Sequence, residues 1–269
     1  MRPRTARRLG VHALAALALL WAPSSRAGPA DGVLSFGIYD VPGFHEVSPG
    51  GAVSGRAIAV LARLAAGASL EPRFRALPRA RIVPALLGGE IDISLIGEGS
   101  QGDAPLIGLG RALRLSVVAI ARKGLPLAAA DDLRGLRVGA RRATSVQRFA
   151  PAVRDEDLVE INDFTQSVRL LARGRVDALV TTCQGVEAAA KAEGIARDVL
   201  GAFLPLGSLE VHGYAAPGLA GSAKLRRLAA AFATFDWSPL AQASSWCEES
   251  RSSTGLDARA ARRAPALDG

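Results

Sequence analysis

The chain has 269 residues, of which 49% are hydrophobic and 5% aromatic, so it can form one large or two small domains around a core of mainly Ala, Leu and Val. Its formal net charge of +8 does not indicate a nucleic-acid partner, because the arginines are scattered and not gathered into a stripe interleaved with aromatic residues. Five of the 33 basic residues lie in the first 27 positions, where there is no acid, which leaves 28 basic against 25 acidic residues. The remaining surface is therefore expected to be weakly basic and solvated.

The N-terminus has the pattern of a secretory signal. Residues 1–8 are basic, residues 9–22 are apolar, and Ser25-Arg-Ala27 fits a small-x-small cleavage site, which predicts a signal peptide over residues 1–27. The apolar run is shorter than the roughly 20 residues of a membrane span. No cysteine follows it to carry a lipid anchor. An exported, soluble mature chain is expected.

The first half of the mature chain alternates strands and helices. A strand over residues 33–39 ends in the Pro-Gly turn of residues 40–44, and residues 53–66 form a helix with apolar side chains on one stripe. A strand follows over residues 70–74. After a loop over residues 106–110, residues 113–121 are predicted to form a strand that crosses between two lobes.

One pattern occurs twice and organises the chain. Residues 77–97 give an amphipathic helix, a stop at Gly88 and Gly89, and an apolar strand that ends in a polar loop at residues 97–101. Residues 168–182 repeat the order, with Gly174 between the helix and the strand. Two copies of a helix–Gly–strand unit predict two similar α/β lobes, with ligands expected at the carboxyl ends of the strands.

The second half continues the alternation. Strands are predicted over residues 136–140, 158–161 and 176–180, and a helix begins at Val146. Asp163 or Thr165 is expected to cap the next helix, and residues 184–193 form another. Residues 199–204 are predicted as an edge strand and residues 208–216 as a separate strand returning to the first lobe. Residues 222–235 form an amphipathic helix, residues 237–246 a docking helix, and residues 251–269 a frayed tail.

Isolated side chains offer few other sites. Cys183 and Cys247 are compatible with one disulfide or with two buried thiols, and neither has the spacing of a metal ligand. His45 and His212 stand alone, so no metal site is predicted. Asp92 and Asp177, which begin the two repeated strands, are interpreted as structural residues that bond nearby backbone.

Taken in order, these motifs resemble a known family. They are Gly88-Gly-Glu-Ile-Asp92, Asp132-Leu-Arg-Gly-Leu-Arg-Val-Gly139, Thr144-Ser145 and Gly174-Arg-Val-Asp-Ala178. The set resembles the periplasmic solute-binding proteins of the amino-acid-binding type, extracellular solute-binding protein family 3, over residues 33–248. The resemblance implies an α/β type II periplasmic-binding-protein fold of two lobes joined by two crossover hinge strands. Lobe 1 would comprise residues 28–120 and 211–250, lobe 2 residues 121–210, and residues 251–269 a flexible tail.

The resemblance also implies a function. A member of this family is a monomeric, non-enzymatic receptor without a cofactor, which binds a small-molecule ligand in the periplasm and delivers it to the membrane subunits of an ABC importer. The positions that match the family's ligand contacts are, in chain order, Tyr39, Asp40, Phe44, Gly97, Glu98, Ser100, Arg141, Thr144, Ser145, Thr181 and Thr182. Thr144 and Ser145 at a helix start beside Arg141 would suit an anion. The alternatives are a plain helix cap there and a core position for Phe44 and Tyr39.

Two departures from the family pattern affect the ligand. Members that bind α-amino acids carry an Arg after the first repeated strand and an acid after the second, but residues 99–105 hold no Arg and residues 181–184 no acid. Arg79 or Arg81 would have to replace the first anchor and Glu98 the second. A small polar or anionic metabolite is therefore expected in place of a standard amino acid.

Two other functions remain open. An enzyme on the same scaffold, such as a cyclohexadienyl dehydratase, would need a positioned general acid, for which Glu98 and Asp103 are the candidates. A ligand-responsive partner protein that transports nothing is the other. No His-centred triad, metal spacing or phosphate loop favours catalysis, so a non-enzymatic receptor is the leading hypothesis.

Overall fold

The computed structural model describes residues 32–142, 146–241, 245–246 and 248, all of which fall in one compact unit. The predicted signal peptide over residues 1–27, the predicted tail over residues 251–269, Thr144, Ser145 and Cys247 lie outside the described residues. Within the described part, no helix combines the length and apolar character needed to cross a bilayer.

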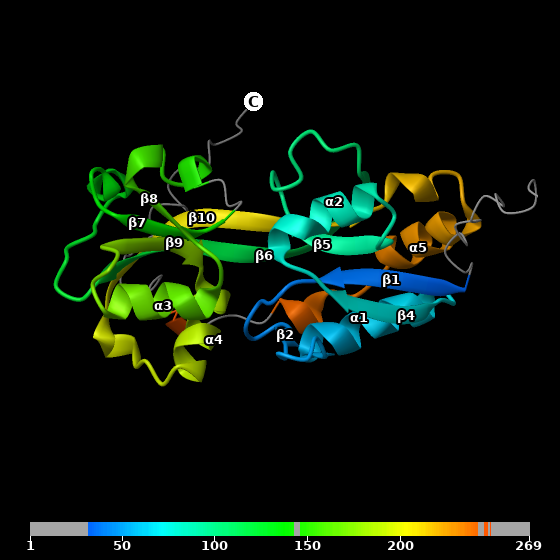
Figure 1. Cartoon of the computed structure of the whole chain (residues 1–269), viewed down its shortest axis with the longest axis horizontal. Coiled ribbons are helices and arrows are strands. Elements are labelled where there is room, and N and C mark those ends of the chain that lie inside the picture. The colour runs from blue at the N-terminus through cyan, green and yellow to red at the C-terminus, as the bar shows by residue number, and fades with distance from the viewer. Residues whose placement is uncertain (1–31, 143–145, 242–244, 247, 249–269) are drawn as a thin grey trace, which may run out of the picture. The chain divides into compact units, whose positions relative to one another are not determined.

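An eight-stranded sheet runs through the described chain in the order β4-β1-β5-β10-β6-β9-β7-β8 (Figure 1). Its strands are β1 (Val33–Ile38), β4 (Glu71–Ala76), β5 (Ile93–Gly97), β6 (Ile107–Arg122), β7 (Val138–Arg141), β8 (Leu158–Ile161), β9 (Ala178–Thr182) and β10 (Leu200–Ala215). A separate two-stranded sheet pairs β2 (Glu46–Val47) with β3 (Val53–Ser54).

Two long strands join the two halves of the sheet. β6 and β10 have 16 residues each and pair antiparallel from Leu200 opposite Arg122 to Ala215 opposite Ile107. On one side β10 pairs antiparallel with β5, which continues into the parallel strands β1 and β4. On the other side β6 pairs antiparallel with β9, which continues into the parallel strands β7 and β8. The two predicted lobes and two crossover strands are therefore present.

α-Helices cover both faces of the sheet in lobe 1 and one face in lobe 2. In lobe 1, α1 (Arg56–Gly67) and α5 (Ala223–Ala233) share a buried core with one face, and α2 (Ile82–Leu87) packs with the other. In lobe 2, α3 (Phe164–Ala172) and α4 (Cys183–Ala192) cover one face, as Figure 1 shows. Along β6, Val118 and Ile120 join the core beneath these helices, whereas Val117 and Ala119 join the core on the opposite face.

Helix ends follow the local capping rules. The Asp163 carboxylate accepts a hydrogen bond from the Gln166 backbone N–H at the start of α3, which confirms Asp163 over Thr165 as the cap. Ser222 caps α5 in the same way, at 3.0 Å from the Leu225 nitrogen.

Two expectations about β6 and β10 were wrong. Residues 107–110 were expected in a loop, but they extend β6 because they pair with the end of β10. The edge strand over residues 199–204 and the returning strand over residues 208–216 are one central strand. Pro205 and Gly207 lie between the two predicted strands, and a register shift between them, with Gly207 at a φ of 142°, lets the pairing continue.

Two helix predictions also changed. The helix expected from Val146 is a single 3₁₀ turn, Val146–Arg148. The segment after α5 does not form one docking helix in lobe 1: Ser238–Leu240 is a 3₁₀ turn there, whereas Trp246 packs edge-on against Phe203 in the core of lobe 2, with ring centroids 6.0 Å apart. The chain after α5 therefore contacts both lobes.

Candidate ligand-binding cleft

Strands from both lobes end at one cavity beside β6 and β10. β5 ends at Gly97, β7 at Arg141 and β9 at Thr182, and all three residues line a cavity of about 90 Å³. Eight of the twelve predicted ligand-binding residues line it: Tyr39, Arg79, Gly97, Glu98, Ser100, Arg141, Thr181 and Thr182. The structure therefore brings together positions from five separate segments of the chain, in a place where α/β sheets bind ligands.

The other predicted positions lie elsewhere. Asp40 lines an adjoining cavity of about 460 Å³, which shares Tyr39, Arg79 and Arg141 with the first. Burial raises the pKa of the Asp40 carboxyl, against the opposing charge of Arg141. Phe44 is buried in the lobe 1 core with the Arg56 guanidinium over its ring. Thr144 and Ser145 lie outside the described residues.

Arg141 is one of three arginines that line the cavity. Its guanidinium lies 4.3 Å from the ring centroid of Phe164 and 5.7 Å from that of Tyr39. Its Nε atom is buried without a hydrogen-bond partner, and among the described residues no carboxylate lies within 4.0 Å of the guanidinium.

The charge of Arg141 is costly where it lies. Burial lowers the pKa of its guanidinium and the charge of Arg79 lowers it further, whereas Tyr39, Asp40 and Asp163 oppose the shift. A buried cation that is only partly compensated by more distant charges is stabilised when an anion binds it. The local chemistry therefore suits a carboxylate or another small anion.

Arg79 reaches across the cleft from lobe 1. One terminal nitrogen donates to the Ser100 hydroxyl at 2.9 Å, and the other donates to the backbone carbonyl of Arg142 in lobe 2 at 3.0 Å. Arg81, the other candidate anchor, is 61% exposed and its nearest carboxylate is Glu90, at 3.8 Å. Of the two arginines proposed from the sequence, Arg79 is the one that lines the cleft.

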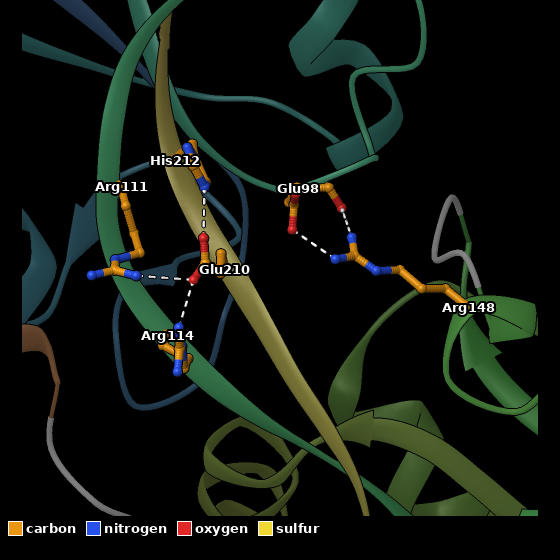
Figure 2. Close-up of polar contacts among 6 residues, drawn as sticks. All are labelled: Glu98, Arg111, Arg114, Arg148, Glu210 and His212. Atoms are coloured by element: carbon orange, nitrogen blue, oxygen red, sulfur yellow. Dashed lines mark hydrogen bonds and ion pairs between the residues drawn. The ribbon is translucent and has the colours of Figure 1, made fainter. Parts of the chain in front are cut away.

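A second contact joins the lobes between Glu98 and Arg148. One guanidinium nitrogen of Arg148 lies 2.7 Å from a Glu98 carboxylate oxygen, and another donates to the Glu98 carbonyl at 3.3 Å (Figure 2). Both side chains are 42% exposed. Glu98 was considered as a ligand for a cationic group, but its carboxylate is engaged by an arginine of the other lobe.

The floor of the cleft is apolar and was not predicted. Leu115, Val117, Leu209 and Val211 of the two crossover strands line it, together with Phe149 and Phe164 of lobe 2. Gly97 permits close packing here, since a Cβ at that position would lie 3.0 Å from a Leu209 methyl carbon. Crossover strands that run beneath the site were a usable signal for these residues. The sequence signal for Arg148 was weaker and consisted only of its position in the segment that follows β7.

Other residues considered for catalysis or disulfide formation are not part of the cavity lining. Asp103, the other candidate general acid, is exposed and does not line the cavity. In the described part of the chain, no three His, Cys, Asp or Glu side chains gather as metal ligands would. Cys183 is disulfide-bonded in the core of lobe 2 and is not among the residues that line the cleft.

No family model and no curated protein matches the sequence. Solved structures do match. An arginine-bound, truncated arginine-binding protein from T. maritima is 19% identical over 76% of this chain and 97% of its own, with a TM-score of 0.62. The substrate-binding protein of an amino acid ABC transporter is 17% identical over 75% and 92%, with a TM-score of 0.61.

A third matching structure is a sensor domain. The sensor domain of a histidine kinase, described as similar to periplasmic binding proteins, is 19% identical over 88% of this chain and 97% of its own, with a TM-score of 0.63. At such identities the likeness concerns the fold. The chain therefore has the two-lobe α/β fold of the periplasmic amino-acid-binding proteins, as its sequence motifs predicted.

Proposed function

We propose that this chain is an exported receptor that captures a small anionic solute between its two lobes in the periplasm. The observation that carries the proposal is Arg141, a partly buried guanidinium beside two aromatic rings, whose charge is not matched by a carboxylate within ion-pair distance among the described residues. A solute that contacts both lobes favours the closed arrangement by its differential affinity for it. Arg79 supplies a second cation from lobe 1.

A thermal-shift screen tests this proposal. The purified protein is melted with acetate, succinate and glutamate, and with putrescine as a cationic solute. An anion at about 100 times its Kd should stabilise the fold by about 2.7 kcal/mol, a shift of a few degrees. Arg141→Met should abolish the shift. Arg142→Met is the matched control, because the neighbouring Arg142 side chain is 60% exposed and pairs with Glu160.

Two results would overturn the proposal. One is stabilisation by putrescine with none by the anions. The other is an Arg141→Met variant that binds the anions as well as the parent chain does. A cooperative melt in every sample shows that the variants are folded, so that a lost shift reports binding.

Delivery to an ABC importer is the downstream role that we propose for the captured solute. Uptake of a labelled solute by cells that lack the chain tests it, and uptake should be restored by the parent chain but not by Arg141→Met. The sensor-domain match favours a second role, in which capture signals to a partner protein and uptake is unaffected. Recovery of the solute unchanged after incubation with the protein would exclude turnover by an enzyme on the same scaffold.

A further inference from the structure

An apolar recess adjoins the cleft inside lobe 1. It has a volume of about 60 Å³ and shares Tyr39, Val41, Leu115 and Val211 with the cleft. The rest of its wall comes from lobe 1 and includes Phe36 of β1, Ala57 of α1 and Leu113 of β6. The recess therefore adjoins the cleft at the residues that the two cavities share, and one of these, Tyr39, lies beside Arg141.

The recess has little polar character of its own. The Ser94 hydroxyl donates to the Gly37 carbonyl at 2.9 Å and is satisfied. His45 bonds the Tyr39 carbonyl through Nε2, and its Nδ1 atom is buried without a partner. An apolar group would therefore fill this recess at little cost in desolvation.

The cleft offers no free carboxylate for an ammonium group. Glu98 is the acidic residue among the described residues that line the 90 Å³ cavity, and its carboxylate already pairs with Arg148. Asp40 and Asp163 line the neighbouring 460 Å³ cavity, which shares Tyr39, Arg79 and Arg141 with the cleft but does not reach Leu115 or Val211. An α-amino acid with its side chain in the recess would therefore meet no unpaired carboxylate among the described residues that line the cleft itself.

We propose that the solute is a carboxylic acid with a compact apolar tail and no ammonium group, its carboxylate on Arg141 and its tail in the recess. This proposal rests on the proposed function and narrows it to a class of ligand. The recess and the cleft together match the roughly 150 Å³ of an apolar cavity that holds a benzene ring. The carboxylate takes up part of this combined space, so the tail is at most the size of a phenyl group or a branched alkyl chain.

Matched pairs of ligands test the proposal by isothermal titration calorimetry. 3-Phenylpropanoate is compared with phenylalanine, and 4-methylpentanoate with leucine, because each pair differs by one ammonium group. The apolar acid of each pair should bind at least tenfold more tightly. Succinate and glutamate serve as polar acids, and acetate as an acid without a tail.

The outcomes separate this proposal from the proposed function. Binding of succinate or glutamate without binding of the apolar acids would overturn the apolar tail and leave an anion receptor. Binding of phenylalanine or leucine as tight as that of the matched acid would overturn the exclusion of the ammonium group. Failure of every anion to bind would overturn the proposed function itself.

Substitutions that fill the recess test whether the apolar tail of the solute binds there. Ala57 of α1 lines the recess and is 3% exposed, so Ala57→Leu should weaken 3-phenylpropanoate at least tenfold and leave acetate unchanged. Ala66→Leu is the matched control, because Ala66 lies on an exposed face of the same helix. If A57L melts at a lower temperature than the parent chain, Ala57→Val repeats the test with a smaller group. Unchanged binding of 3-phenylpropanoate to a folded filled variant would contradict the placement.

Discussion

Asp92 and Asp177 hold equivalent positions in the two lobes. The Asp92 carboxylate accepts from the Ser35 backbone N–H at 2.7 Å, and the Asp92 N–H donates to the Ser35 carbonyl at 2.9 Å. Asp177 makes the same two contacts with Arg137, at 3.1 and 2.8 Å. In each lobe, the acid before the repeated strand therefore ties that strand to the first strand of its lobe.

The surroundings of Asp92 and Asp177 predict different losses of stability when each carboxylate is removed. Asp92 and Lys224 form a buried ion pair, with side chains 5% and 2% exposed, whereas Asp177 pairs with the more exposed Arg122 and Arg137. Asp92→Ala leaves a buried ammonium unpaired and should lower the free energy of unfolding by about 3–5 kcal/mol. Asp177→Ala should cost clearly less.

Urea denaturation of the two variants measures this difference. A double variant, Asp92→Asn with Lys224→Met, should recover part of the lost stability because no charge remains buried. Equal midpoints for Asp92→Ala and the parent chain would contradict the assigned role of the buried pair.

The Glu98–Arg148 contact predicts a bias toward lobe closure. Removing it with Glu98→Gln should weaken closure by about 0.2–1 kcal/mol, because both side chains are partly exposed. The distance between spin labels placed on the two lobes should then shift toward longer values. Salt should produce the same change in the parent chain but have little effect on the variant.

Glu210→Gln provides the control for this experiment. Glu210 is also an ion-paired acid, but its partners Arg111 and Arg114 lie on β6, the strand directly beside its own strand β10 (Figure 2). Its loss removes ion pairs within the crossover strands and none between the lobes. A matching change in lobe distance for Glu210→Gln would show that the effect is not specific to the interlobe contact.

His45 predicts how stability depends on pH. Burial lowers the pKa of His45 to about 4. The nearby charge of Arg141 also lowers this pKa, whereas the hydrogen bond to the Tyr39 carbonyl raises it. Since a histidine in the unfolded chain titrates near 6.5, the unfolded state binds more protons between these values. Stability is therefore full above pH 6.5 and falls by about 3 kcal/mol as the pH drops to 4.

Urea midpoints measured from pH 4 to 7.5 test this prediction. His45→Phe should flatten the slope between pH 6.5 and 4. A slope that persists in His45→Phe would assign the pH dependence to other groups.

The disulfide of Cys183 gives the last prediction. Cys247, the other cysteine of the sequence, lies outside the described residues, and its pairing with Cys183 remains a prediction. Closing the chain between positions 183 and 247 should contribute about 4 kcal/mol to the free energy of unfolding. Reduction should lower the urea midpoint accordingly. Alkylation of both cysteines in the unreduced, unfolded protein would contradict the pairing.

Local patterns predicted the repeated units and the edge where they meet. Glycine stops, helical stripes and apolar strands placed β5 and β9, and the order of strands placed their carboxyl ends at a common site. The same patterns failed at β10, because Pro205 and Gly207 break a strand in isolation. Pairing with β6 on one side and β5 on the other sustains it in the sheet.

The sequence by itself determined two α/β lobes and the segments that face each other, because periodicity and chain punctuation are properties of neighbouring residues. Only the tertiary structure decided which side chains of those segments contact one another. It placed Arg141 between Tyr39 and Phe164, paired Glu98 with Arg148, and left a recess behind the cleft floor. These features depend on burial and on contacts between residues tens of positions apart, which local periodicity does not encode.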